Sequence, residues 1–258
     1  MIELIDLTLL PTFLLMFARL LAFIMTLPVF SYRTIPTPYR LGLAFFLSLL
    51  AISHIETDLS SIDTHFLLLL IKEVLVGLMI GFISYLVLSV VQIAGGFIDF
   101  QMGFAIANVI DPQTGAQSPL IGQYFYMIAI LFLLAVDGHH ILINGMIHSF
   151  QVIPLESFFK IEGNFAEFIL VTFNRLFIIA FQMALPLVGS LFLVDVALGI
   201  IARTVPQLNV FVVGLPLKIT VSFTVLFFFM AMYIGLTKLL FQSLFNIMNE
   251  LMLILGGG

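Results

Sequence analysis

Residues 168–202 read FILVTFNRLFIIAFQMALPLVGSLFLVDVALGIIA, and this stretch decides the fold class. It is almost continuously apolar, so it predicts a helix that lies in a membrane. As one helix it would be about 50 Å long at about 1.5 Å per residue, against a hydrocarbon core about 30 Å thick. Either Pro186 and Gly189 interrupt this helix, or it forms a long hairpin with the apolar residues 212–248 that projects from the bilayer and is covered by other subunits.

The rest of the chain has the same apolar character. Of its 258 residues, 62% are hydrophobic and 9% are charged, and the mean hydropathy is +1.24. Soluble domains contain roughly 45–50% apolar residues, so a water-soluble core cannot bury this much apolar surface. We therefore predict an all-α integral membrane protein in which residues 1–258 form a single membrane domain.

About six hydrophobic helical segments, arranged as hairpins, account for most of the length. Pro38 suits the first turn of a helix, so the second segment is expected to begin about three residues before its apolar run. The six stretches are 7–30, 41–55, 66–91, 124–136 with a possible extension to residue 147, 168–202, and 212–248.

The distribution of basic residues between the segments predicts the orientation. Arg33 and Arg40 follow the first segment, and Arg203 and Lys218 lie at the junction of the last two, so these loops are expected in the cytoplasm. The other loops are mainly acidic, which predicts that both chain ends lie outside. The N-terminal residues 1–6 lack the basic region of a secretory signal, so the first segment is expected to be retained.

Charge and cysteine content exclude several classes of protein. The net charge is −5 and no basic cluster occurs, which argues against nucleic acid as a partner. The chain has no cysteine, so it has neither disulfides nor thiolate metal sites.

Small residues mark places where helices can approach closely. Gly77 and Gly81 form a Gly-x-x-x-Gly pattern within an apolar run, which is typical of helix packing in membranes. We assign Gly95 and Gly96 to helix packing as well.

Several charged residues lie within or beside the apolar stretches. Because a charge that faces lipid is costly, each should face protein or a water-filled space. They either form a solute or proton pathway of titrating carboxylates, or form ion pairs that fix helix partners. We favour ion pairs, in part because the Lys72 side chain can extend to the membrane interface. The residues are Arg19, Lys72, Glu73, Arg175, Asp195 and Lys238.

The histidines do not indicate a metal site. His139, His140 and His148 form no His-x-x-x-His pattern, and carboxylates near them are scattered, so we interpret them as residues of a surface loop. No nucleophile with an orienting base is recognisable. We predict no enzyme, no metal and no cofactor.

The most unusual stretch is 94–123, AGGFIDFQMGFAIANVIDPQTGAQSPLIGQ. Glycines and uncharged polar residues interrupt membrane-compatible sequence, and Asp111-Pro112 with Gly115 favours a turn. Non-helical backbone at membrane depth occurs only where protein buries it or where it lines a cavity. A plain surface loop is the alternative.

A second short polar segment joins the two over-long stretches. Pro206 is expected to end the first helix, and Gln207 and Asn209 can cap exposed backbone groups. Residues 203–211 are thus predicted to form a tight hairpin turn.

Short motifs follow one another along the chain in a specific order. With this order and spacing, the sequence resembles the FliR/SctT family of type III secretion export-gate subunits over essentially its whole length. The motifs are Arg19 with Leu27-Pro28-Val29-Phe30 and Pro36; Glu73, Gly77 and Gly81; Ala94-Gly95, Asp99 and Gln101-Met-Gly103; Asp111-Pro112; Gly138-His139; Ser149-Phe150 and Pro154; and Arg203-x-x-Pro206-Gln207-x-Asn209-x-Phe211.

The resemblance implies a non-catalytic subunit of the flagellar gate that carries unfolded flagellar proteins across the bacterial inner membrane. Its partners would be FliP- and FliQ-like proteins in a helical assembly, with FlhB- and FlhA-like proteins nearby in the basal body, and membrane lipid. Residues 1–165 would be FliP-like, and residues 166–258 would be a FliQ-like helical hairpin.

The same resemblance assigns two sites. One is a plug of the closed gate within 108–122, and the other is a turn at its cytoplasmic entrance. The plug residues are Asn108, Asp111, Pro112, Gln113, Thr114, Gly115, Gln117 and Ser118; the turn residues are Arg203, Pro206, Gln207, Asn209 and Phe211.

Two other functions compete with the export gate. A secondary transporter of a small solute would use Asp195, Glu73 and Arg175 as intramembrane ligands, but its inverted repeats are not recognisable. An intramembrane metalloenzyme would need paired metal ligands within one span, and the sequence does not supply them.

Overall fold

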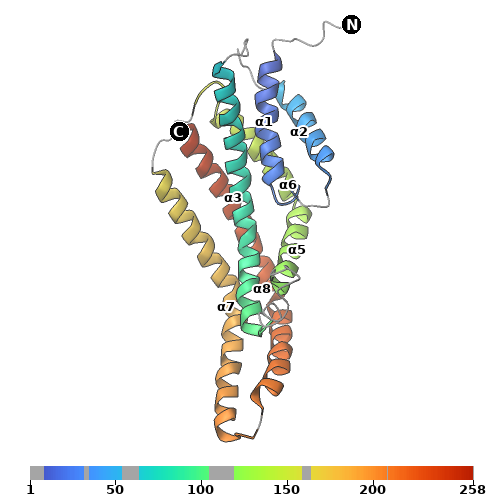
Figure 1. The fold of residues 1–258 in the computed structure, drawn as a ribbon, viewed down its shortest axis with the longest axis vertical. Helices are drawn as coiled ribbons and strands as arrows, with labels where there is room; N and C mark the ends of the chain where they lie inside the picture. Colours follow the sequence, from blue (N-terminus) through green and yellow to red (C-terminus); the bar gives the residue numbers. More distant parts are fainter. Residues whose placement is uncertain are drawn as a thin grey trace. The chain divides into compact units, whose positions relative to one another are not determined.

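The computed structural model describes residues 9–31, 35–53, 64–104, 119–158, 164–207 and 209–257. Within these ranges every regular element is a helix, and Figure 1 shows their order along the chain. The helices are α1 (Leu10–Thr26), α2 (Thr37–Ile52), α3 (Thr64–Met102), α5 (Leu120–Ala135), α6 (Gly138–Val152), α7 (Phe165–Thr204) and α8 (Val210–Gly256).

Each of the six predicted apolar stretches contains a helix, although the first helix ends at Thr26, before the predicted residue 30. The second helix begins at Thr37, as the position of Pro38 predicted. The fourth stretch forms two helices, because α5 and α6 meet at a bend of 73°. The expectation of non-helical backbone was wrong for residues 94–102 and 120–123, which belong to α3 and α5.

Among the described residues, three helices are long and apolar enough to cross a membrane, and the bent pair α5 and α6 could form a fourth crossing. They are α3, α7 and α8; α1 and α2 are shorter apolar helices. Helix α7 runs through Pro186 without interruption, so of the two alternatives for this stretch the break at Pro186 and Gly189 is wrong. The Ser190 hydroxyl donates to Pro186 O, four residues before it, at 2.7 Å.

The chain packs into two compact units, each assembled from separate segments. Unit 1 contains Met1–Val87, Leu134–Thr172 and Gln242–Gly258, and unit 2 contains Leu88–Leu133 and Phe173–Phe241.

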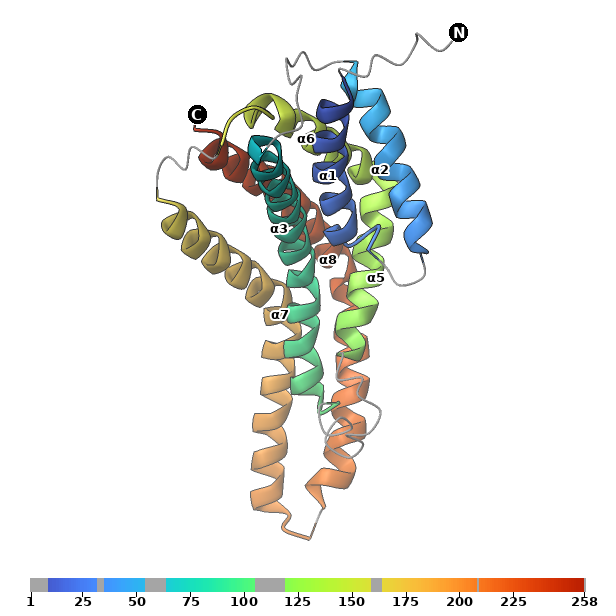
Figure 2. The ribbon, with the colours of Figure 1, turned by 45° about the horizontal axis from the view of Figure 1, so that its top comes forward.

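Unit 1 is built around the beginning of α3. Helices α1 and α2 lie side by side in both views (Figures 1 and 2), with Phe13, Phe17 and Phe45 in edge contact between them. Its core includes fully buried apolar side chains such as Leu15, Ile80 and Met146.

Unit 2 contains the end of α3, most of α5, and the hairpin of α7 and α8. Both views show the hairpin extending beyond the end of α3 (Figures 1 and 2). Many large apolar side chains on this hairpin are exposed, including Leu193, Phe211, Phe227 and Phe228. Lipid or other protein must cover them in the membrane.

Candidate functional sites

The end of α3 and the start of α5 are fixed to each other in unit 2. The Asp99 carboxylate accepts hydrogen bonds from Ile121 N at 3.0 and 3.3 Å, so a side chain of α3 caps the first turn of α5. A Cβ at Gly95 would collide with the Gly122 backbone, so the two helices cross at close range. Gly96 is in looser contact, because a Cβ there would lie 3.4 Å from Pro119 Cγ.

The predicted plug residues fall in 105–118, outside the described residues. The residues that flank this segment belong to unit 2. Helix α3 ends at Met102, Gly103 adopts a φ of 88°, and Phe104 N donates to Asp99 O at 3.0 Å. Asp99 therefore contacts both the residue that leads into the segment and the helix that follows it.

Asp195 joins three helices of unit 2. Its carboxylate forms an ion pair with Lys218 of α8 and accepts a hydrogen bond from Gln101 Nε2 of α3 at 2.8 Å. About a third of the Asp195 side chain is exposed. The carboxylate thus links both arms of the hairpin to α3, which agrees with the ion-pair interpretation of this charge.

The turn of the hairpin has the local structure that the sequence predicts. Helix α7 ends two residues before Pro206, and Asn209 Oδ1 accepts hydrogen bonds from Phe211 N at 3.1 Å and Val212 N at 3.4 Å. Asn209 is therefore the N-cap of α8. Arg203, Gln207 and Phe211 are exposed around it.

A buried ion cluster lies at the centre of unit 1. Arg19 and Glu73 are both 0% exposed and form a two-point ion pair, in which Nη2 of Arg19 lies 2.9 Å from Oε1 of Glu73. The guanidinium also donates to Ser149 O at 2.9 Å and Ile153 O at 2.8 Å, and it lies over the Phe150 ring. Arg19 thereby joins α1, α3 and the end of α6.

Lys72 is the third member of this cluster. Its ammonium pairs with Glu73 and donates to the carbonyl oxygens of Pro154 at 2.8 Å and Ser157 at 3.0 Å. The side chain is 2% exposed, because the chain itself surrounds the ammonium. It fixes the segment that follows α6.

The Gly77 and Gly81 positions bring α3 close to α1, as predicted. A Cβ at Gly77 would collide with the backbone oxygen of Arg19, and a Cβ at Gly81 would collide with Thr26. The same approach places Glu73 opposite Arg19.

The remaining charges do not form a common site. Arg175 and Lys238 are exposed on α7 and α8. Arg175 and Asp195 lie on one helix, 20 positions apart, which is about 30 Å along its axis. Glu73 is occupied by Arg19 and Lys72, so these residues do not assemble the ligand set of a solute transporter.

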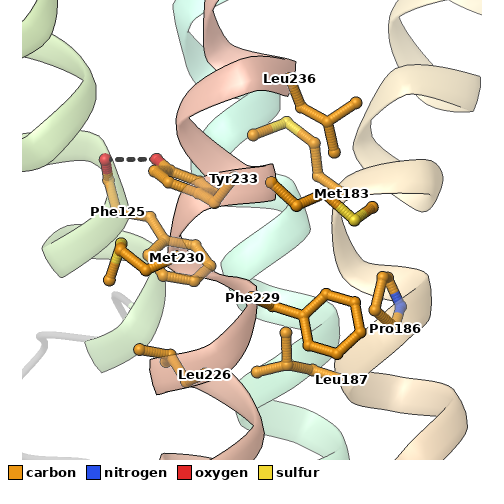
Figure 3. A pocket seen from close by; sticks show the side chains of 10 residues that line it. Phe125, Met183, Pro186, Leu187, Leu226, Phe229, Met230, Tyr233 and Leu236 are labelled. Atoms are coloured by element: carbon orange, nitrogen blue, oxygen red, sulfur yellow. Dashed lines mark hydrogen bonds between the residues drawn. The ribbon is translucent and has the colours of Figure 1, made fainter.

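An apolar pocket lies between α5, α7 and α8 in unit 2 (Figure 3). Its lining includes Met183, Pro186 and Phe229, and the Tyr233 hydroxyl beside it donates to Phe125 O at 2.7 Å. This lining supplies packing surface without carboxylate, amine or imidazole groups.

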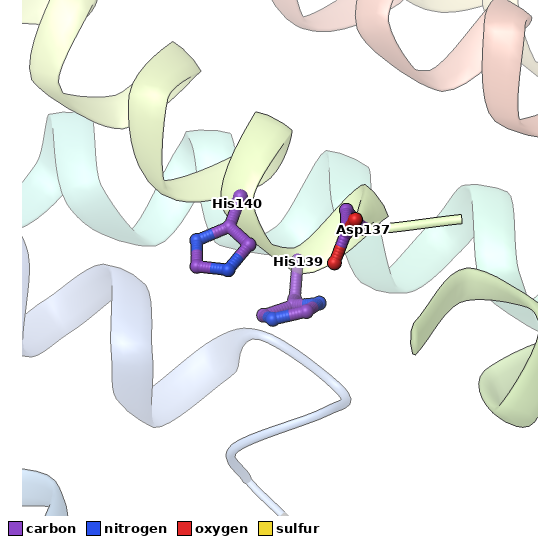
Figure 4. Close-up of side chains that lie close together, drawn as sticks. All are labelled: Asp137, His139 and His140. Atoms are coloured by element: carbon purple, nitrogen blue, oxygen red, sulfur yellow. The ribbon is translucent and has the colours of Figure 1, made fainter. Parts of the chain in front are cut away.

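The histidines lie in a helix, so their interpretation as loop residues was wrong. His139, His140 and His148 belong to α6, and His148 Nδ1 lies 3.0 Å from Gln151 Oε1. Asp137 precedes the helix and lies beside His139 and His140 (Figure 4). Sequence reasoning missed this grouping, because the spacing Asp-x-His-His matches no common metal-binding motif.

Comparison with known proteins agrees with the sequence motifs. Residues 10–244 match the family described as Bacterial export proteins, family 1. The chain is 54% identical to the flagellar biosynthetic protein FliR of Bacillus subtilis (strain 168), over 95% of this chain and 96% of that one. It is 30% identical to the FliR of Escherichia coli (strain K12), over 90% and 89%. It is 29% identical to the Yop proteins translocation protein T of Yersinia pestis, over 82% of each chain.

Proposed function

We infer the function of this chain from the family to which it belongs, family 1 of the bacterial export proteins: it is a non-enzymatic, multi-pass subunit of a flagellar protein-export apparatus in the inner membrane. The observation that carries this conclusion is the 54% identity to a flagellar biosynthetic protein over nearly the whole of both chains. We assign the chain to a flagellar apparatus because this identity of 54% exceeds the 29% identity to a translocation protein of the Yop system.

The partners we propose are FliP- and FliQ-like subunits, with FlhB- and FlhA-like proteins nearby and unfolded flagellar proteins as cargo. The exposed apolar side chains of the hairpin support an assembly, because Phe211 is 88% and Phe227 76% exposed in the isolated chain. We further propose that residues 1–165 take the place of a FliP-like subunit and residues 166–258 that of a FliQ-like hairpin. Both chain ends would lie outside the cytoplasm.

We propose that residues 108–118 plug the closed gate. The fixed junction of α3 and α5 supports this role, because Asp99 and the Gly95–Gly122 crossing give the segment a rigid base. Deletion within 110–118 is expected to leave assembly intact and to make the closed gate leak ions. Membrane conductance of cells carrying the deletion tests this, and an unchanged conductance would exclude the plug.

The turn 203–211 is proposed to line the cytoplasmic entrance. Its exposed Arg203 and Gln207 would contribute to a polar ring, and the Asn209 cap would hold them at the tip of the hairpin.

Co-purification tests the proposed assembly. The tagged chain would be extracted from its native cell in mild detergent, and the proteins bound to it identified by mass spectrometry. Recovery of P- and Q-type export proteins is expected. A pure homo-oligomer would overturn the proposal and favour a solute transporter.

A further inference from the structure

The bend between α5 and α6 gathers three potential metal ligands in unit 1. One ligand atom each from Asp137, His139 and His140 lies within 4.8 Å of the others (Figure 4). Two imidazoles and a carboxylate are donors that suit zinc and related divalent cations.

The backbone at Asp137 explains why its carboxylate is available. Asp137 is the N-cap of α6, where an aspartate usually accepts a hydrogen bond from the helix backbone. Here it adopts a left-handed conformation, with φ of 55°, and its side chain makes no capping hydrogen bond. It is the one non-glycine residue with positive φ among the described residues. The carboxylate lies beside the imidazoles instead.

His139 provides a second, independent observation. Its Nδ1 is buried and has no hydrogen-bond partner among the described residues. A buried polar nitrogen without a partner is costly, and coordination of a cation through Nδ1 would offset that cost. The His139 and His140 rings are adjacent, with centroids 4.2 Å apart.

From this arrangement we propose that Asp137, His139 and His140 bind a divalent cation of the zinc type, which fixes the first turn of α6. Two ligands of one zinc ion lie at most about 4 Å apart, because each bond is about 2.0–2.1 Å long. Binding therefore requires a small rotation of the Asp137 and His140 side chains, both of which are exposed. Solvent would complete the coordination. The site is independent of the export function proposed above.

The carboxylate is essential to this site. The N-terminus of α6 carries a partial positive charge that opposes a cation, and the charge of Asp137 offsets it. Asn tolerates the left-handed conformation as Asp does, so Asp137→Asn removes the charge while the backbone is kept.

Titration of zinc chloride into the full-length chain, purified in detergent with a tag that contains no histidine, tests the proposal. Calorimetry is expected to show one site in the wild type, with affinity at least about tenfold weaker in Asp137→Asn, His139→Gln and His140→Gln. His148→Gln is the matched control, since His148 lies on the same helix outside the cluster, and it should bind as the wild type does. Zinc should also raise the Tm of the wild type and of His148→Gln, but not that of the three ligand variants.

Circular dichroism in zinc-free buffer verifies that each variant folds. If the His139→Gln variant does not fold, Asp137→Asn and His140→Gln still test the proposal, because both residues are exposed. The proposal is overturned if no saturable binding occurs, if these variants bind zinc as tightly as the wild type, or if His148→Gln weakens binding as much as they do.

Discussion

Glu73 supplies the negative charge of the buried cluster. It is fully buried and pairs with two cations, Arg19 and Lys72, which are themselves 0% and 2% exposed. Removing one partner of a buried ion pair leaves charge without compensation, which is among the most destabilising changes known for single residues. The cluster therefore depends on this carboxylate more than on either base.

Replacement of Glu73 by the isosteric glutamine is expected to lower the stability of the chain by about 3–5 kcal/mol, because two buried cations then lack a counter-charge. Thermal unfolding in detergent would measure the loss. Glu167→Gln is the control: Glu167 is exposed in the first turn of α7, and its replacement should change stability by less than about 0.5 kcal/mol. Equal Tm values for both variants would contradict the role of the cluster.

At the hairpin turn, Asn209→Ala removes the side-chain oxygen that caps α8, and should cost the turn about 1 kcal/mol. We expect smaller swimming halos in soft agar, whereas Asn209→Asp keeps the cap and should swim normally. Arg203→Ala tests the entrance itself, because it leaves the cap intact. Normal motility of both alanine variants would remove the turn from the functional residues.

The contact of α1 with α3 depends on the absence of a side chain at Gly77. In Gly77→Ala the new methyl group meets the Arg19 backbone, which cannot move aside as a flexible side chain can, so we expect a loss of about 1–3 kcal/mol. Gly42→Ala on α2 is matched to it, because a Cβ there has no neighbour within 4 Å. Its Tm should be unchanged or slightly higher, because alanine favours a helix more than glycine does. A similar loss in both variants would contradict the close contact of α1 with α3 as its cause.

The helices themselves could largely be predicted from the sequence, because apolar runs and prolines act locally. Pro38 placed the start of α2, and Pro206 placed the end of α7. Residues 94–102 were missed because their glycines reduce local helix propensity, while the close crossing of Gly95 with Gly122 stabilises the helix from outside. The uninterrupted course of α7 through Pro186 was also not predictable from local sequence, because proline usually kinks or ends a helix.

The candidate sites were less predictable. Arg19, Glu73 and Asp195 stood out because charges are rare in apolar sequence, but their partners could not be read from the chain. Ser149 lies 130 positions from Arg19, and Asp99 caps a helix 22 positions away. The Asp137 cluster was missed because its Asp-x-His-His spacing matches no common metal-binding motif.

For the molecule as a whole, the exposed apolar faces of α7 and α8 predict dependence on partners. Expressed alone, the chain should be degraded several times faster than when P- and Q-type subunits are expressed with it, because unassembled membrane helices remain open to proteolysis. Pulse-chase labelling would measure both half-lives. Equal half-lives would indicate that lipid alone covers these faces.

The Arg19–Glu73 pair also imposes an order on biogenesis. Arg19 leaves the ribosome 54 residues ahead of Glu73, which at about 5–20 residues per second is an interval of roughly 3–10 s. During that interval an arginine in an apolar helix has no counter-ion, and its transfer to the bilayer centre costs about 2.5–3.5 kcal/mol. The first helix is therefore expected to stay at the insertion machinery or the membrane surface until α3 arrives, so that the two enter the lipid as a neutralised pair.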